Sequence, residues 1–428
     1  MIQVSNTDKM GGGLMQLVAY GAQDVYLTGN PQITFFKVVY RRHTNFSMES
    51  IQQTFNGNPG FGQRVSCTVS RNGDLCHKVY LEVDLGQTET VTNGWQGYVN
   101  SIGHAIIKSV EVEIGGQRID KQYGDWMEAL DELSCPAGKE LGRERLFGKY
   151  PNPSKDLNTG DTHDAVALGP MGHNDSSTDG PVKLYIPLQF WFCRNPGLAL
   201  PLIALQYHEV KINVEFAKAD ECMISGKFTS VRTTEQNDGS GNSLDFSITK
   251  APSMSASLWC DYMYLDTDER RRFAQVSHEY LIEQLQFTGD ESLSDGDNKV
   301  RMNFNHPVKE LVWCLQKSEA TAMDYNGVTK SARILLNGHD RMAERKGEYF
   351  RDVQPFQHHT RIPEKNVYCY SFALKPEDHQ PSGTCNFSRI DNATLSLDVD
   401  GACTGKLFAV NYNVLRIMSG MGGLAYSN

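Results

Sequence analysis

The chain of 428 residues lacks an excess of basic charge and any long apolar run. Acidic residues number 51 against 41 basic ones, giving a net charge of −10. Proteins held on nucleic acid by phosphate contacts need a basic face, so this balance argues against that class. The longest apolar run, residues 198–205, is far short of the roughly 20 residues that span a bilayer. We therefore expect no direct nucleic-acid contact and no transmembrane segment.

Paired cysteine motifs are also lacking. The 10 cysteines are scattered without a C-x-x-C pair, which favours buried small side chains over a zinc site or a disulfide framework. The first residues carry no basic segment followed by an apolar one, as a secretory signal would. Both features predict a chain made and kept in the cytosol.

Catalytic patterns are lacking as well. His278 and Glu279 begin like a zinc-protease motif, but Ile282 stands where the second His should be. No P-loop or nucleophile elbow occurs. The pair His358–His359 could lie near a metal, but without suitably spaced carboxylates we interpret it as an exposed loop pair. The sequence predicts no enzyme, no cofactor and no metal site.

What the chain does contain is a long series of short strand patterns separated by turns. Alternating or β-branched stretches predict strands at residues 34–40, 65–70, 79–85, 105–114, 183–192, 210–216, 281–288, 300–304, 333–336, 367–374 and 393–399. Helical patterns are sparse, and the best cover residues 124–133 and 266–274. Many short strands with frequent turns indicate an all-β sandwich or barrel.

The most informative feature is an internal repeat. Five segments of the first half match five of the second half in the same order, at an offset that falls from 234 to 150 residues. The matches are 47–54 with 281–288, 113–116 with 335–338, Tyr185 with Tyr368, 210–214 with 393–397, and 259–265 with 409–415. Each match alone is weak, but five in one order indicate two copies of one β-fold, joined near residues 266–275.

The first copy is longer by 84 residues. With strands lettered B to I in chain order, the excess falls in or near the D–E, F–G and H–I connections. Connections of an antiparallel sandwich alternate between its two ends, so all three insertions are expected at one end, as a loop crown. Residues 151–181 and 230–243 are rich in Gly, Pro, Asn, Asp and Ser, which is typical of long surface loops.

One candidate modification site follows from this organisation. Sequons occur at Asn45, Asn174, Asn386 and Asn392. Asn392 leads directly into a predicted strand, whereas Asn174 lies inside the longest predicted loop. Asn174 is therefore the candidate glycosylation site.

Several segments closely resemble the major capsid proteins of nucleocytoplasmic large DNA viruses, and the algal (chlorella) virus proteins among them most of all. These segments are residues 11–24 (GGGLMQLVAYGAQD), 28–36 (TGNPQITFF), 196–209 (PGLALPLIALQYHE), 278–289 (HEYLIEQLQFTG), 386–395 (NFSRIDNATL) and 411–426 (NYNVLRIMSGMGGLAY). The resemblance runs from about Gly11 to the last residue, except in the loops 151–181 and 217–257 and around residues 317–330.

The resemblance implies two tandem eight-stranded antiparallel jelly rolls with a few short helices in loops, in agreement with the repeat. The expected organisation is an N-terminal arm at 1–26, a first jelly roll with long outward loops at 27–267, and a more compact second jelly roll at 268–428. It further implies homotrimeric, pseudo-hexameric capsomers that tile an icosahedral shell. Expected partners are neighbouring capsomers and minor capsid and vertex proteins. The expected location is the virion, assembled in the host cytoplasm.

Two other interpretations stay open at this point. Jelly rolls also occur in carbohydrate-binding modules and cupin-like enzymes, although the clustered His and carboxylate ligands of cupins are absent. The chain could also be a minor capsid or vertex paralogue instead of the main tile. Trimer formation and copy number in particles separate these alternatives from a major capsid protein.

Overall fold

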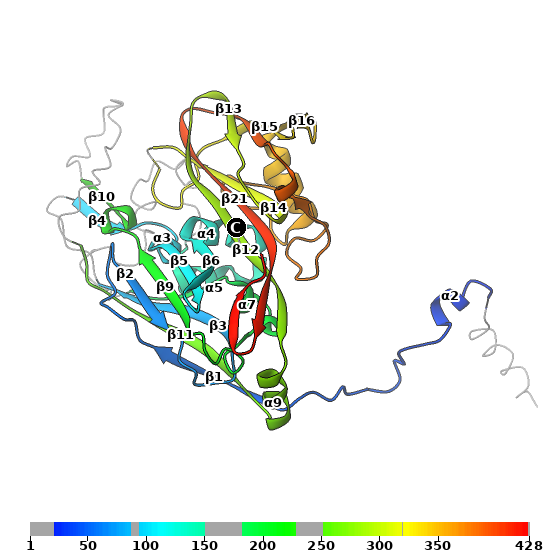
Figure 1. Cartoon of the computed structure of the whole chain (residues 1–428). Coiled ribbons are helices and arrows are strands. Elements are labelled where there is room, and N and C mark those ends of the chain that lie inside the picture. The colour runs from blue at the N-terminus through cyan, green and yellow to red at the C-terminus, as the bar shows by residue number, and fades with distance from the viewer. Residues whose placement is uncertain (1–20, 87–93, 150–181, 228–250, 319, 427–428) are drawn as a thin grey trace, which may run out of the picture. The chain divides into compact units, whose positions relative to one another are not determined.

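The structure is a computed structural model that describes residues 21–86, 94–149, 182–227, 251–318 and 320–426 (Figure 1). The chain divides into two units, Met1–Asn45 and Phe46–Asn428. The described part of the first unit, residues 21–45, has one short helix, α2 (Val25–Thr28), and no strand. The strand predicted over residues 34–40 is therefore wrong. Its apolar pattern is that of a strand, but none of the strands that the structure describes pairs with its backbone groups.

The second unit begins with two antiparallel sheets of orders β1-β11-β3-β7 and β2-β9-β5-β6. Their strands are β1 (Phe46–Gln53), β2 (Arg64–Thr68), β3 (Leu75–Leu85), β5 (Ile107–Ile114), β6 (Gln117–Tyr123), β7 (Val182–Pro187), β9 (Val210–Phe216) and β11 (Met254–Leu265). A short strand, β8 (Leu200–Pro201), also pairs with β3. We refer to this pair of sheets as the first roll.

Two further antiparallel sheets of orders β12-β21-β14-β18 and β13-β20-β15-β16 follow, and we refer to them as the second roll. Their strands are β12 (His278–Leu293), β13 (Gly296–Arg301), β14 (Pro307–Gln316), β15 (Thr329–Leu336), β16 (His339–Asp340), β18 (Val367–Ser371), β20 (Ala393–Val399) and β21 (Cys403–Met418). Three short strands pair with them, namely β17 (Arg345–Lys346), β19 (Cys385–Asn386) and β22 (Met421–Leu424).

Short helices occupy the connections. They are α3 (Ile102–Ala105), α4 (Gly124–Ser134), η1 (Ala137–Lys139), α5 (Glu140–Phe147), α7 (Trp191–Arg194), η4 (Pro196–Leu198), α8 (Ala219–Cys222), α9 (Thr267–Gln275), η5 (Tyr349–Val353), α10 (Gln354–His358) and η6 (Phe387–Arg389). The two predicted helices are confirmed as α4 and α9. Helix α9 starts where expected because the Asp266 side chain accepts a hydrogen bond of 2.7 Å from the Thr267 amide.

The two rolls have the same topology, which confirms the duplication. Lettered B to I in chain order, the eight main strands of each roll form one sheet of order B-I-D-G and another of order C-H-E-F. This is the jelly-roll arrangement, so the predicted all-β fold of two tandem eight-stranded jelly rolls is confirmed.

The registers inferred for the repeat hold in one sheet and fail in the other. In the C-H-E-F sheets, Val112 pairs with Ile212 and the repeat equivalents Ile334 and Leu395 pair in the same way, all four side chains being buried. In the B-I-D-G sheets the matches join opposite faces. Tyr185 points out of its roll and is 37% exposed, whereas its supposed equivalent Tyr368 is buried in the core.

The matches 47–54 with 281–288 and 259–265 with 409–415 have the same fault. Cys260 faces the core of the first roll, whereas Val410, at the same offset of 150, faces out of the second roll. Because strand side chains alternate between faces, a slip of one residue reverses every assignment. The strands of the B-I-D-G sheets are equivalent, but the offsets assigned to them are wrong by one residue.

Each roll encloses its own apolar core. In the first roll the inward side chains of β3 face those of β5 and β9, with Leu81, Val112 and Ile212 all buried. In the second roll, Trp313 and Ile334 occupy the corresponding places. All 10 cysteines lack disulfide partners, and eight of them are buried, as predicted.

The described parts of the three predicted insertions meet one another at one end of the first roll. Strand β4 (Gly94–Tyr98), from the D–E insertion, pairs with β10 (Met223–Lys227), from the H–I insertion. Helix α3 of the D–E insertion contacts α4 and α5 of the F–G insertion and α8 of the H–I insertion. Figure 1 shows β4, β10 and α3 gathered on this side of the roll. We refer to these elements as the crown.

Candidate functional surfaces

The candidate glycosylation site, Asn174, lies outside the described residues. Two other sequon residues hold turns with their side chains. Asn386 accepts a hydrogen bond of 3.1 Å from the Ser388 amide, and Asn392 lies 3.5 Å from the Thr394 hydroxyl. The predicted interpretation of His358–His359 as an exposed pair is wrong for His359, because its side chain is only 2% exposed.

His359 is held between two carboxylates of the second roll. Its Nδ1 lies 3.0 Å from Glu377, and its Nε2 lies 3.4 Å from Glu310. Burial by itself lowers the pKa of His359, but its contacts with Cys369, Glu310 and Glu377 outweigh that effect and raise it to about 12. The imidazole is therefore protonated at neutral pH and acts as a buried cation, which neutralises the carboxylates beside it.

The most extensive candidate surface is the seam between the two rolls. Helix α4 turns its apolar side away from the first roll and packs against the outer face of the B-I-D-G sheet of the second roll. The seam contains Trp126, Ala129, Leu130 and Leu133 of α4 and Val312, Cys314, Val367, Cys369, Phe408 and Val410 of the sheet. All of these side chains are buried, so the two rolls share a continuous apolar contact.

A buried charge cluster borders this contact. Glu128 of α4 is fully buried and lies 2.7 Å from His104, 2.7 Å from Lys365 of the second roll, and 3.3 Å from Lys149. Burial by itself raises the pKa of Glu128, but Lys365 foremost, Lys149 and the hydrogen bond with His104 hold it well below its usual range. Glu128 is therefore ionised at neutral pH and links the crown to the second roll.

Glu132, one turn further along α4, strengthens the same link. Its carboxylate accepts a hydrogen bond of 2.9 Å from the Glu364 backbone amide in the second roll and one of 3.0 Å from Arg143 in the crown. It also pairs with Lys149. Every charge of this cluster has a partner of opposite sign, which offsets the cost of removing it from water.

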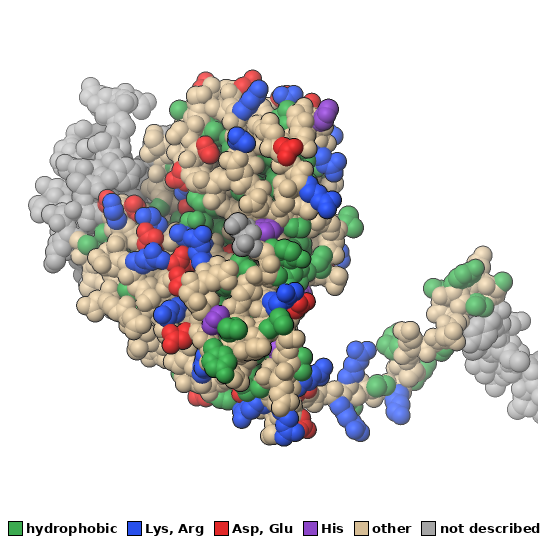
Figure 2. Space-filling view, in the orientation of Figure 1, with side chains coloured by type: hydrophobic (Ala, Val, Ile, Leu, Met, Phe, Trp, Pro, Cys, Tyr) green, Lys and Arg blue, Asp and Glu red, His purple; other side chains and the backbone are tan. Residues whose placement is uncertain are grey.

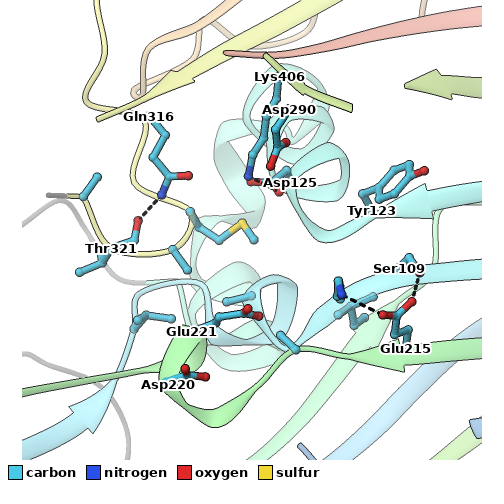
Figure 3. A pocket seen from close by; sticks show the side chains of 18 of the residues that line it. Ser109, Tyr123, Asp125, Glu215, Asp220, Glu221, Asp290, Gln316, Thr321 and Lys406 are labelled. Carbon is cyan, nitrogen blue, oxygen red and sulfur yellow. Dashed lines mark hydrogen bonds and ion pairs between the residues drawn. The ribbon is translucent and has the colours of Figure 1, made fainter. Parts of the chain in front are cut away.

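An open groove of about 870 Å³ runs along the seam (Figure 3). Two ion pairs lie within the groove. Lys406 lies 2.7 Å from Asp125, and Lys108 lies 2.9 Å from Glu215. Among the residues that the structure describes, no group of His, Cys, Asp or Glu is arranged to hold a metal ion. The groove thus lies along the boundary between the two rolls, with residues of both in its walls.

The N-terminal unit is the other candidate surface. Its described residues expose apolar side chains far more than a folded core would, with Tyr26 at 92%, Phe35 at 87%, Phe36 at 99% and Tyr40 at 86% exposure. Figure 2 shows basic side chains interspersed with these apolar ones. Apolar side chains gathered on an exposed segment mark an interaction site.

The sequence analysis predicted neither the packing of α4 on the second roll nor the burial of His359 between two carboxylates. It located the α4 helix, but nothing in the local pattern shows that Leu130 and Leu133 contact a different roll. The apolar run 311–315 is a usable signal, because a strand buried on both faces must be covered on its outer side.

The fold defines a double jelly-roll protein. The most extensive surface described above is the buried contact between its two rolls. Residues 34–266 match the family described as "Major capsid protein N-terminus", and residues 269–423 match "Large eukaryotic DNA virus major capsid protein". The chain belongs to the family of large eukaryotic DNA virus major capsid proteins and is a structural protein of the virion, not an enzyme. The resemblance noted in the sequence is thereby confirmed.

Two curated relatives illustrate the match. The major capsid protein of Pyramimonas orientalis virus is 55% identical, with 98% of this chain and 100% of that protein aligned. The major capsid protein of Paramecium bursaria Chlorella virus 1 is 43% identical over the same shares.

Solved structures agree. A chain of the quasi-atomic PBCV-1 virus capsid is 38% identical with a TM-score of 0.73, covering 92% of this chain and 100% of that chain. The Faustovirus major capsid protein, at 14% identity and a TM-score of 0.71, covers 97% of this chain and 99% of that chain and shares the fold. None of the described helices is long and apolar enough to cross a membrane.

Proposed function

We propose that three copies of this chain form a pseudo-hexameric capsomer that tiles an icosahedral shell. The observation that carries the proposal is the tandem repeat, since two rolls with one topology meet through an extensive buried seam. Three such chains in a closed ring would supply six similar rolls. Cyclic closure also protects the sheet edges that open jelly rolls leave unpaired.

Light scattering on a sizing column tests the trimer directly. Three chains of 47.9 kDa give an expected mass of about 144 kDa. A mass of about 48 kDa at micromolar concentration, with no larger species, would contradict the proposal. Negative-stain images of the same fraction should show hexagonal outlines.

The arm is proposed to bind outside its own capsomer. Val25 and Tyr26, the exposed large apolar side chains among its described residues, need a partner surface, and neighbouring capsomers or minor capsid and vertex proteins are the proposed partners. Removing residues 1–26 should leave the trimer intact and impair lattice assembly. Loss of the trimer itself in this variant would argue against the role. We retain the expected division of the chain into residues 1–26, 27–267 and 268–428 as part of this proposal.

The crown is proposed to face outward on the virion, with Asn174 as its glycosylated residue. The length and composition of the F–G insertion support this assignment. Intact-mass measurement of protein from particles should show a glycan mass that disappears in an Asn174→Gln variant. An unmodified mass in the parent protein would refute the modification without affecting the capsomer.

Assembly is proposed to take place in the host cytoplasm, without direct contact between this protein and the genome. The unpaired cysteines fit a reducing compartment, and the net charge of −10 suits a shell with no nucleic-acid lining. A minor capsid or vertex paralogue is the rival role within the virion. Quantitative mass spectrometry of particles separates the two, because a main tile must be the most abundant shell protein.

A further inference from the structure

The N-terminal unit differs in charge from the rest of the chain. From Val25 to Asn45 the sequence contains no Asp or Glu, whereas it contains Lys37, Arg41 and Arg42. These three cations give the stretch a formal net charge of +3 in a chain whose net charge is −10. Because the stretch holds no carboxylate that could pair with them, the cations are available to an anionic surface.

The same stretch exposes a dense set of apolar side chains. Among the described residues, 29–45 form neither helix nor strand, so no regular element buries one side of them. The large apolar side chains of residues 33–40 are all at least 70% exposed, namely Ile33, Phe35, Phe36, Val38, Val39 and Tyr40. A contiguous apolar stretch of this kind marks a binding surface. We refer to residues 33–42 as the basic segment (Figure 2).

Cations and apolar side chains are interleaved in the basic segment. Lys37 lies between Phe36 and Val38, and two arginines directly follow Tyr40. A surface that binds the segment must therefore offer negative charge and apolar volume side by side. The surface of an anionic bilayer does so, because its charged headgroups lie directly above the acyl chains.

Other anionic partners match only part of the segment. Nucleic acid would pair with the cations and stack on the aromatic rings, but it offers no apolar volume for the aliphatic Ile33, Val38 and Val39. A protein surface would need a preformed groove that fits all six apolar side chains, whereas acyl chains adapt to any apolar shape. The composition of the segment thus favours a lipid surface.

We propose that the basic segment docks onto the surface of a lipid bilayer with anionic headgroups. Its aromatic rings enter the boundary between headgroups and acyl chains, while its three cations contact the headgroups. The segment lies on the membrane and does not cross it, since its apolar stretch is far shorter than the roughly 20 residues that span a bilayer. This contact goes beyond the proposed capsomer, and it can form whether the chain is monomeric or trimeric.

Vesicle flotation of the full chain tests the proposal. The protein is mixed with vesicles of phosphatidylcholine alone, or with vesicles of equal parts phosphatidylcholine and phosphatidylserine. Each cation near an anionic surface should strengthen binding about fivefold, so the dissociation constant should be about 100-fold lower for the anionic vesicles. Sodium chloride should reduce this preference, because salt screens exposed charges. Equal binding to both kinds of vesicle, or binding to neither, would overturn the proposal.

A charge variant and a matched control locate the binding in the basic segment. Replacing Lys37, Arg41 and Arg42 together by Gln should abolish the preference for anionic vesicles. The control replaces one exposed Lys and two exposed Arg of the second roll by Gln, namely Lys299, Arg301 and Arg341. It removes the same charge and should keep the preference. An equal loss in the control would mean that net charge alone governs binding, against the proposal.

The apolar contribution is measured separately. Phe35→Ser combined with Phe36→Ser keeps all three cations and should weaken binding to anionic vesicles by at least about tenfold, because two rings no longer enter the bilayer. A folded variant, checked by circular dichroism, that binds like the parent would contradict insertion of the rings. Tighter binding of the parent to a single-stranded DNA oligonucleotide than to anionic vesicles would identify nucleic acid as the partner and overturn the proposal. None of these outcomes bears on the trimer, which light scattering tests.

Discussion

The two rolls share a topology but differ in what covers their outer faces. The first roll carries three insertions, and one of them, α4, reaches across to the second roll. The second roll has shorter connections, and the helical segment between its strands F and G leaves Val353 and Phe356 39% and 77% exposed. The difference shows how two copies of one fold become structurally distinct. The first roll contributes helix α4 to the seam and the second roll contributes a sheet face, so the two rolls are not interchangeable.

The largest expected effect comes from removing the central charge of the seam. Glu128→Ala leaves Lys149, Lys365 and His104 buried without their shared carboxylate. Breaking a buried pair costs about 3–5 kcal/mol, so urea unfolding should show a loss of that size. Glu279→Ala is the control, because the pair of Glu279 with Arg416 is exposed and is expected to contribute less than about 1 kcal/mol. Equal losses would mean that the cluster does not stabilise the seam.

The apolar contact of α4 is tested by truncating one buried side chain of α4 and one exposed side chain of α10 to alanine. Leu133→Ala removes a side chain that is 1% exposed and should cost about 2–5 kcal/mol in unfolding free energy. In α10, Phe356→Ala, at 77% exposure, should change the unfolding of the dissociated chain by less than about 0.5 kcal/mol. Chemical denaturation at concentrations below trimer formation measures both. A similar loss of unfolding free energy at the two positions would show that both side chains are equally buried in the dissociated chain, against this expectation.

His359 offers a pH-dependent contrast. His359→Gln replaces the buried imidazolium between Glu310 and Glu377 with a neutral amide and should cost about 2 kcal/mol, the range for hydrogen bonds to charged groups. Because the folded pKa of His359 is raised above the ordinary value of about 6.5, its contribution is fully present below about pH 6.5 and is lost progressively as the pH rises from there toward the folded pKa, by about 1.4 kcal/mol per pH unit. The difference in unfolding free energy between variant and parent should therefore be largest near pH 6 and clearly smaller at pH 8, and a difference that is the same at both pH values would contradict the assignment.

The smallest effect concerns thiol reactivity. Each roll has one cysteine that is only partly buried, Cys135 in the first and Cys385 in the second. Burial raises the pKa of Cys67 and Cys193 to about 12, so these thiols stay protonated and unreactive. Labelling of the native protein with Ellman's reagent at pH 8 should modify two thiols at most. Rapid labelling of more would show that the cores open.

The duplication could be predicted from sequence because strand order and turn spacing survive in the amphipathic C-H-E-F sheets. In those sheets one face is buried, so alternation marks the inward residues, as at Val112 and Ile334. In β14 the run from Leu311 to Leu315 is buried on both faces, because α4 covers the outer side. Such a strand shows no alternation, and a match by residue type can slip by one position without any sign in the sequence.

The seam and the His359 site could not be predicted for a related reason. Their partners are far apart in the chain, as with Glu128 and Lys365 or His359 and Glu310. A local pattern shows where a helix or turn lies but not what covers it.

Helix α9 connects β11 directly to β12 and so tethers one roll to the other. The seam is consequently an intramolecular contact, formed at an effective concentration that dilution does not change. Contacts between chains must instead form by encounter and depend on how much protein has accumulated. The covalent connection thus separates two events in time, because each chain can complete its own pair of rolls before any lattice begins to grow.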